Sequence, residues 1–158
     1  ASKQGQASAR STSLGDPSAP IVLFCNPNAV FYEYLNYQSE WLNYYTKTLG
    51  CNMIIFNYRG YGRSSMKTST SKTRKYFGLM NPDDIMKDTE VVLEYALEKF
   101  ATSQNKIVVH GESMGGMAAA YVAMRSALNK QIHVDMAFID RTFSSLDNVA
   151  YWSAGVTA

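Results

Sequence analysis

Short apolar runs alternate along the chain with longer segments whose apolar residues recur at helical spacing. The runs at 21–25, 53–56, 107–109 and 134–139 have the length and composition of buried strands. Helical periodicity predicts helices over 32–49, 81–100 and 114–128. This alternation predicts an α/β fold: a parallel sheet with right-handed crossovers and helices on both faces.

Small and polar residues connect the third predicted strand to the third predicted helix, in the order His110-Gly111-Glu112-Ser113-Met114-Gly115-Gly116. A serine flanked by glycines on such a sharp turn is forced into a strained, positive-φ conformation, in which a side chain at Gly111 or Gly115 would collide with neighbouring backbone. The hydroxyl is thereby lifted clear of the sheet. The first N–H groups of the helix, beginning with that of Met114, point to where an oxyanion would form. Ser113 is therefore a candidate nucleophile.

The composition describes one globular unit. Its 158 residues, 46% of them hydrophobic, suffice for a single core. A formal charge of +2 is too small to indicate nucleic acid or an anionic membrane as the main partner. No apolar run approaches the length of a transmembrane helix, and residues 1–20 lack the apolar core of a signal peptide. We therefore expect a soluble intracellular protein, with a flexible arm or linker at 1–20 and a folded part at 21–158.

The two cysteines, Cys25 and Cys51, fall at opposite ends of neighbouring predicted strands. Two cysteines so placed give no disulfide framework. We expect both to be buried thiols.

Three separated motifs together resemble the α/β-hydrolase superfamily, and within it the branch of small serine hydrolases that includes fungal Bem46-like and animal ABHD-type proteins. The elbow Gly111-Glu112-Ser113-Met114-Gly115 fits the family's Gly-x-Ser-x-Gly pattern. The segment Asn26-Pro27-Asn28-Ala29 stands where this family carries a His-Gly-Asn-Ala oxyanion loop. The third motif follows the second predicted strand and is close to the family's sequence at that place; it reads Tyr58-Arg59-Gly60-Tyr61-Gly62-Arg63-Ser64. The resemblance covers residues 21 to about 152, but only the front half and middle of a complete hydrolase domain.

The resemblance implies a partial α/β-hydrolase fold with four recognisable strands, in the order second, first, third, fourth. It implies that Ser113 attacks an acyl carbonyl and that the backbone N–H groups of Met114 and Asn28 hold the oxyanion. No metal or organic cofactor is implied. Pro27 removes a donor that the family's loop has, which leaves the geometry around Asn28 open.

A catalytic base is missing from this reading, because the family places its histidine late in the chain, after the acid. His110 lies on the third predicted strand, so we expect its ring in the core or in a hydrogen bond. His133 precedes the fourth strand, at the end away from Ser113, and is expected to be an exposed loop residue. Asp140, at the carboxyl end of the fourth strand, is a candidate catalytic acid. Its alternative role is structural, capping the turn at 142–145 or pairing with Arg141.

The fourth strand also poses a packing problem. An apolar edge such as 134–139 needs a cover, which further sequence or another chain would supply. The basic loop residues Lys67, Lys72, Arg74 and Lys75 form either a solvated loop or an anion-docking surface. An aromatic cluster in the first predicted helix favours core and partner contacts over an acyl pocket; its members are Phe31, Tyr32, Tyr34, Tyr37, Trp41, Tyr44 and Tyr45.

Two functions fit these features. The first is a serine hydrolase of carboxylic ester, thioester or lipid acyl bonds, acting through an acyl-serine intermediate on a small-molecule or lipid substrate, with the acid and histidine supplied from outside this segment. The second is a catalytically inactive hydrolase-like structural subunit of a larger assembly.

Overall fold

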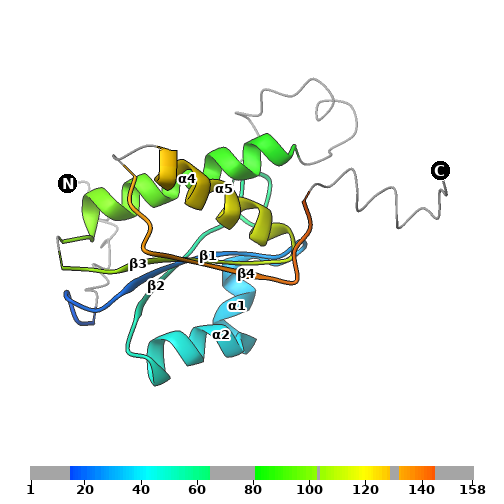
Figure 1. The fold of residues 1–158 in the computed structure, drawn as a ribbon. Coiled ribbons are helices and arrows are strands. Elements are labelled where there is room, and N and C mark those ends of the chain that lie inside the picture. Colours follow the sequence, from blue (N-terminus) through cyan, green and yellow to red (C-terminus); the bar gives the residue numbers. More distant parts are fainter. Residues whose placement is uncertain (1–14, 65–80, 103, 129–131, 145–158) are drawn as a thin grey trace, which may run out of the picture.

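The computed structural model describes residues 15–64, 81–102, 104–128 and 132–144 (Figure 1). In chain order the elements are β1 (Ile21–Cys25), α1 (Tyr32–Gln38), α2 (Glu40–Asn43), the π-helical turn η1 (Tyr44–Thr48), β2 (Asn52–Ile55), α4 (Pro82–Lys99), β3 (Ile107–Glu112), α5 (Met114–Leu128) and β4 (Met136–Asp140). The basic loop, with Lys67 through Lys75, lies outside the described residues.

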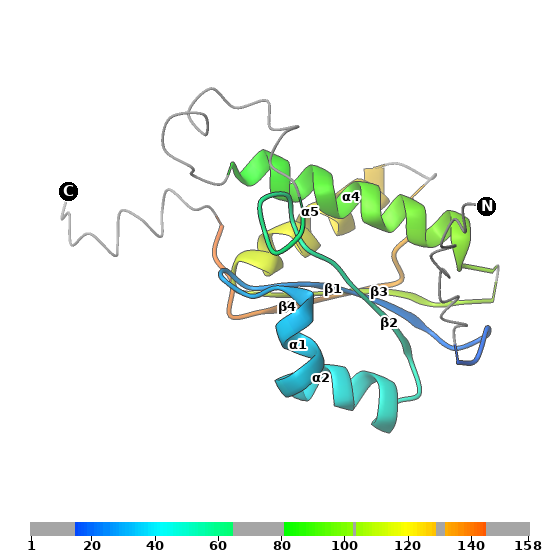
Figure 2. The ribbon, with the colours of Figure 1, turned by 180° about the vertical axis from the view of Figure 1, so that it is seen from behind.

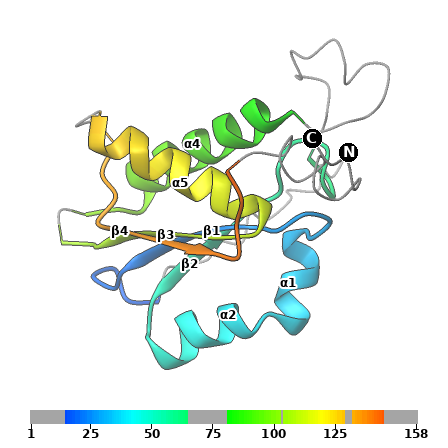
Figure 3. The same cartoon turned by 45° about the vertical axis from the view of Figure 1, so that its right-hand side comes forward.

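The four strands form one parallel sheet, as the sequence pattern predicts, in the order β2-β1-β3-β4 that the family resemblance implies. Helices α4 and α5 cover one face and α1 and α2 lie against the other (Figure 1), which the view from behind also shows (Figure 2). Since all strands run the same way, their carboxyl ends and the loops that follow them meet at one edge of the sheet (Figure 3).

The central strand β1 is buried throughout because both faces and both edges are covered. Its odd positions, Ile21 and Leu23, join the core with Leu93 of α4 and Val122 of α5. The alternate position Phe24 packs edge to face on the His110 ring, toward the opposite helices. Each face of β1 thus has its own layer of apolar contacts.

The prediction of one continuous helix over 32–49 is wrong, because the structure divides this range into α1, α2 and η1. Helix α1 ends at Ser39, which has the extended angles φ −78° and ψ 115°, and the Ser39 hydroxyl accepts a hydrogen bond from Leu42 N at 3.1 Å to begin α2. The following turn is π-helical. A serine that caps a new helix inside a periodic apolar pattern breaks the helix without disturbing the pattern.

Residues 15–20, which the sequence assigns to the amino-terminal arm, carry hydrogen bonds in the structure. The Asn105 side-chain amide donates to the Pro17 and Ala19 carbonyls at 2.8 and 2.7 Å. The Asn52 amide donates to the Asp16 carbonyl at 2.7 Å. Two asparagines therefore tie this segment to the amino ends of β2 and β3; residues 1–14 lie outside the described ranges.

An ion-pair network joins the loop after β2 to α4. The Arg59 guanidinium donates through Nε to Asp88 Oδ1 at 2.7 Å, and Nη2 bonds the same oxygen. Its Nη1 lies 3.1 Å from Asp84 Oδ1, and the Asp84 side chain is only 1% exposed. Asp88 also accepts from the Arg59 backbone N–H at 2.7 Å. One arginine thus neutralises two carboxylates and fixes the direction in which the loop leaves the sheet.

His110 of β3 is fully buried beneath the sheet face that α2 and η1 cover. Its Nδ1 lies 3.0 Å from the Tyr45 hydroxyl oxygen. Four aromatic rings surround it: Phe24, Trp41, Tyr45 and Phe138. Burial lowers the pKa of His110, an effect that the charge of Asp140 partly opposes. His110 is therefore a core residue, as the sequence predicts, and is held neutral.

We expect Arg59→Ala to lower the free energy of unfolding by roughly 3 kcal/mol, because the buried Asp84 carboxylate would lose the guanidinium charge next to it. Arg125→Ala is the matched control, since Arg125 is 38% exposed and its ion pair with Glu90 is screened by solvent, so its loss should cost much less. Urea denaturation measures both. Equal losses in the two variants would contradict the assigned role of Arg59.

Stability should fall on acidification because of His110. Its folded-state pKa is below the roughly 6.5 of an unfolded chain, so the stabilisation is complete above about pH 6.5 and is lost as the pH drops from there toward the folded-state pKa. Urea midpoints between about pH 8 and pH 5 measure this slope. His110→Phe should flatten this slope; an unaltered slope in His110→Phe would show that other groups cause it.

Candidate functional site

Ser113 is the single residue between the end of β3 and the start of α5. Its φ is +54°, in the left-handed region that non-glycine residues rarely adopt, as the sequence predicts. The residue is partly exposed and lies at the carboxyl end of the sheet. A strained, accessible serine in this position is a common arrangement for a nucleophile.

The two glycines of the elbow, Gly111 and Gly115, permit backbone to pack directly on backbone. A Cβ on Gly115 would overlap the carbonyl of Cys25, at the end of β1. A Cβ on Gly111 would overlap the carbonyl of Gly115, the second residue of α5. The elbow can therefore sit against β1 only because both positions lack a side chain.

The edge strand β4 holds the elbow from the other side. Ser113 N–H donates to the Asp140 carbonyl at 2.9 Å. The Thr142 hydroxyl donates to the Ser113 carbonyl at 2.5 Å, and its side chain packs against Gly116. None of the sequence motifs includes Thr142; the signal that points to it is its position two residues after β4, the strand that neighbours the elbow.

The carboxylates near the elbow are bridged by Arg141, which itself has a positive φ of 45°. Its Nη2 lies 2.6 Å from Glu112 Oε1 and 3.0 Å from Asp140 Oδ2. The negative charges of Asp140 and Glu112 raise the pKa of Arg141 further above its usual value, with the Asp140 hydrogen bond as the main cause. The Asp140 side chain is thus engaged in the ion pair that the sequence offered as its structural role.

The loop after β1 carries the second expected oxyanion donor, Asn28. This residue is exposed, and its Oδ1 accepts a hydrogen bond from the Tyr61 hydroxyl at 2.6 Å. The next residue, Ala29, has a φ of +60°. The other expected donor, Met114 N–H, belongs to the first residue of α5, and the Met114 side chain is buried. The loop and the helix start adjoin, since a Cβ on Gly115 would also come within 2.7 Å of the Asn26 carbonyl.

The remaining titratable candidates lie elsewhere. His133 is exposed, 3.3 Å from Asp135, at the amino ends of the strands. Asp135 accepts from Ile107 N–H and Lys106, which lowers its pKa to about 2 and fits a structural role. Burial raises the pKa of the Cys25 thiol to about 12, so Cys25 is not a competing nucleophile. The prediction that Cys51 is buried is wrong, since it is half-exposed in the turn before β2.

Within the described ranges, no three His, Cys, Asp or Glu side chains gather closely enough to hold a metal ion. None of the described helices combines the length and the apolar character that a membrane span requires.

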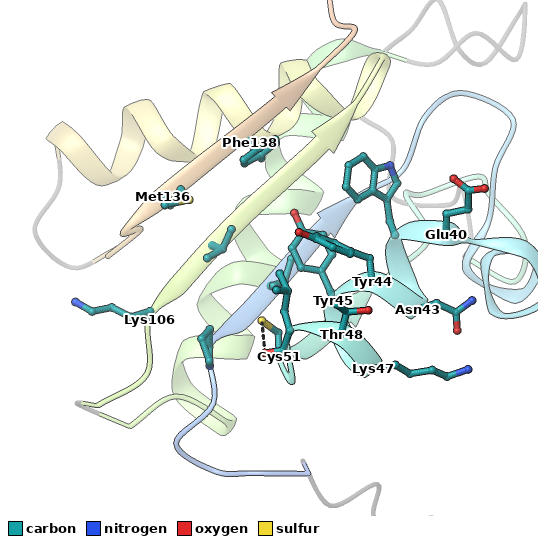
Figure 4. A pocket seen from close by; sticks show the side chains of 15 residues that line it. Glu40, Asn43, Tyr44, Tyr45, Lys47, Thr48, Cys51, Lys106, Met136 and Phe138 are labelled. Carbon is teal, nitrogen blue, oxygen red and sulfur yellow. Dashed lines mark hydrogen bonds between the residues drawn. The ribbon is translucent and has the colours of Figure 1, made fainter.

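Cavities lie on both faces of the sheet. One of about 690 Å³ lies between the start of α4 and α5, beside the elbow, and includes Gly116 and Thr142 with three methionines, Met86, Met117 and Met124. The other, an apolar groove of about 970 Å³, lies on the opposite face, where Tyr44 and Tyr45 of η1 stand across from Met136 and Phe138 of β4 (Figure 4). Part of the predicted aromatic cluster therefore lines an open groove.

Comparison with known proteins gives consistent results. The sequence matches the family model described as alpha/beta hydrolase fold over residues 20–154. Protein bem46 of Schizosaccharomyces pombe is 26% identical over 132 residues, which are 84% of this chain and 38% of bem46. The alpha/beta hydrolase domain-containing protein WAV2 of Arabidopsis thaliana is 26% identical over 131 residues, 83% of this chain and 36% of WAV2. The multifunctional-autoprocessing repeats-in-toxin of Vibrio cholerae is 29% identical over 130 residues, 82% of this chain and 2% of the toxin.

The chain spans less than two-fifths of the length of bem46 and of WAV2. The matched residues 20–154 nevertheless contain every strand and helix of the described structure, including the elbow and both strands that hold it. The chain belongs to the alpha/beta hydrolase fold family.

Proposed function

We propose that this chain carries the nucleophile of a serine hydrolase that cleaves carboxylic ester, thioester or lipid acyl bonds. The observation that supports this most is the strained, partly exposed Ser113 at the β3–α5 junction, in a chain of the alpha/beta hydrolase fold family. A positive φ at a non-glycine residue is costly, by about 1–3 kcal/mol, and such residues concentrate at functional sites.

In the proposed reaction, Ser113 Oγ attacks the acyl carbonyl carbon while a base takes the hydroxyl proton. The carbonyl oxygen becomes an oxyanion, which the backbone N–H groups of Met114 and Asn28 would stabilise. The bond to the leaving alcohol or thiol then breaks, and the proton returns to that group. Water repeats the sequence on the acyl-serine and releases the carboxylic acid.

The base would come from outside this segment. The sequence contains two histidines, and His110 is buried with its Nδ1 bound to Tyr45 while His133 lies at the far ends of the strands. Asp140 remains the candidate acid within the chain. Its backbone carbonyl lies beside Ser113, although its carboxylate is paired with Arg141.

The cavity beside the elbow is our candidate for the acyl group. Methionine side chains adapt to irregular apolar ligands, and three of them line this space next to Gly116 and Thr142, the residues that contact each other across the elbow. This supports substrates with an apolar acyl portion.

The second candidate function, an inactive structural subunit, is favoured by the uncovered edge of the sheet. Met136, Phe138 and Ile139 of β4 are 55, 50 and 40% exposed, and the first two line the apolar groove. Another chain, or further sequence, covering the 134–139 edge would bury them. A structural subunit of this kind would bind its partner chain and would not hydrolyse acyl esters.

Treatment of the natural polypeptide with a fluorophosphonate should attach one phosphonyl group to the peptide that contains Ser113, because only an activated serine reacts rapidly with this probe. Ser113→Ala should abolish labelling. Ser18→Ala, at an exposed serine near the amino ends of the strands, is the matched control and should label like the unsubstituted protein. Absence of labelling in folded protein would refute the hydrolase and favour the structural subunit.

A further inference from the structure

The loop after β1 is held from outside by a side chain that the proposed reaction does not use. We propose that Tyr61 is a positioning residue, whose hydroxyl fixes the conformation of the loop that presents the Asn28 N–H to the oxyanion. The inference rests on the proposed function, and it adds a residue to which no role in the reaction has yet been given.

The contact is a two-point clamp. The Tyr61 hydroxyl donates to Asn28 Oδ1 at 2.6 Å, and its oxygen lies 3.4 Å from Ala29 N, which donates to it. The Tyr61 hydroxyl therefore bonds both the Asn28 side chain and the backbone amide of the next residue, Ala29. Both contacts disappear if the hydroxyl is removed, and no apolar contact of the ring need change.

The ring that makes the clamp is itself anchored. Tyr61 packs edge to face on Tyr58, with ring centroids 6.0 Å apart, and Tyr58 is fully buried. The Tyr58 hydroxyl donates to the Asn26 carbonyl at 3.2 Å, at the beginning of the same loop. Tyr61 N–H bonds the Tyr58 carbonyl at 2.9 Å. Two tyrosines from the loop after β2 thus hold the beginning and the middle of the loop after β1.

The loop needs such support because it is strained and has one backbone donor fewer. Ala29 has a φ of +60°, which an alanine adopts only at a cost of about 1–2 kcal/mol. Pro27 has no N–H with which to bond its surroundings. A strained conformation persists only where neighbouring contacts over-determine it, and the Tyr61 hydroxyl supplies two of them. Without the Tyr61 hydroxyl, the Ala29 backbone would relax and the Asn28 N–H would turn away from the oxyanion.

The test is Tyr61→Phe in the natural polypeptide, with p-nitrophenyl butyrate as substrate. We expect kcat to fall at least about tenfold while KM stays within about twofold, because an oxyanion donor acts on the transition state and not on the bound ester. Tyr95→Phe, at an exposed tyrosine of α4, should leave both constants unchanged. Thermal unfolding of Tyr61→Phe verifies that the fold is retained.

A double-mutant cycle separates the positioning role of Tyr61 from a loss of activity caused by a disturbed fold. Asn28→Ala removes the side chain that Tyr61 grips but keeps the backbone N–H, so the double variant should lose little more activity than Tyr61→Phe alone. Hydrogen exchange at the Ala29 amide should also be faster in Tyr61→Phe than in the unsubstituted protein.

The outcomes are distinguishable. If the unsubstituted protein turns over through Ser113 and Tyr61→Phe retains its kcat, Tyr61 has no positioning role and the proposed function stands. Additive losses in the double variant would likewise overturn the clamp. If Ser113→Ala changes nothing, the proposed function fails and the role of Tyr61 in it fails as well, whatever the amide exchange shows.

Discussion

The close approach of Gly115 to the end of β1 is the contact on which the site depends. Helix α5 can begin directly at the sheet only because no side chain separates the Gly115 backbone from the Cys25 carbonyl. With the helix start so close, the chain has a single residue in which to turn from β3, and that residue, Ser113, takes the positive φ. The strain at the serine is thus a consequence of backbone packing next to it, and the buried strand β1 resists its relaxation.

The parallel sheet explains why residues far apart in sequence meet at this place. The loops after β1, β2, β3 and β4 leave the same edge of the sheet. Tyr61 therefore reaches Asn28, and Thr142 reaches Ser113, although each pair is far apart in sequence. Three of these loops are each fixed by a different means: a tyrosine clamp after β1, an arginine between two carboxylates after β2, and a threonine hydroxyl after β4. The opposite face presents an apolar groove.

Most of the fold could be predicted because it depends on local pattern. Buried strands are short apolar runs, and glycines around Ser113 are demanded by sterics that the sequence displays directly. The break at Ser39 was missed because a capping serine leaves helical periodicity intact. The Tyr61 clamp and the pairing of Arg141 with Glu112 could not be foreseen, since hydrogen bonds between side chains of separate loops depend on their exact separation in space. The exposure of Cys51 was missed because its neighbours on η1 leave a groove rather than a filled core.

The most direct measurement of the central claim compares the unfolding free energies of Gly115→Ala and Gly50→Ala. Gly50 has a positive φ, 65°, but nothing lies within 4 Å of an added Cβ, so alanine there should cost only about 1 kcal/mol of backbone strain. At Gly115 the new methyl group would overlap the Cys25 carbonyl of a buried strand, and the cost should exceed about 3 kcal/mol. A Gly115→Ala protein no less stable than Gly50→Ala would show that the elbow is not built on this contact.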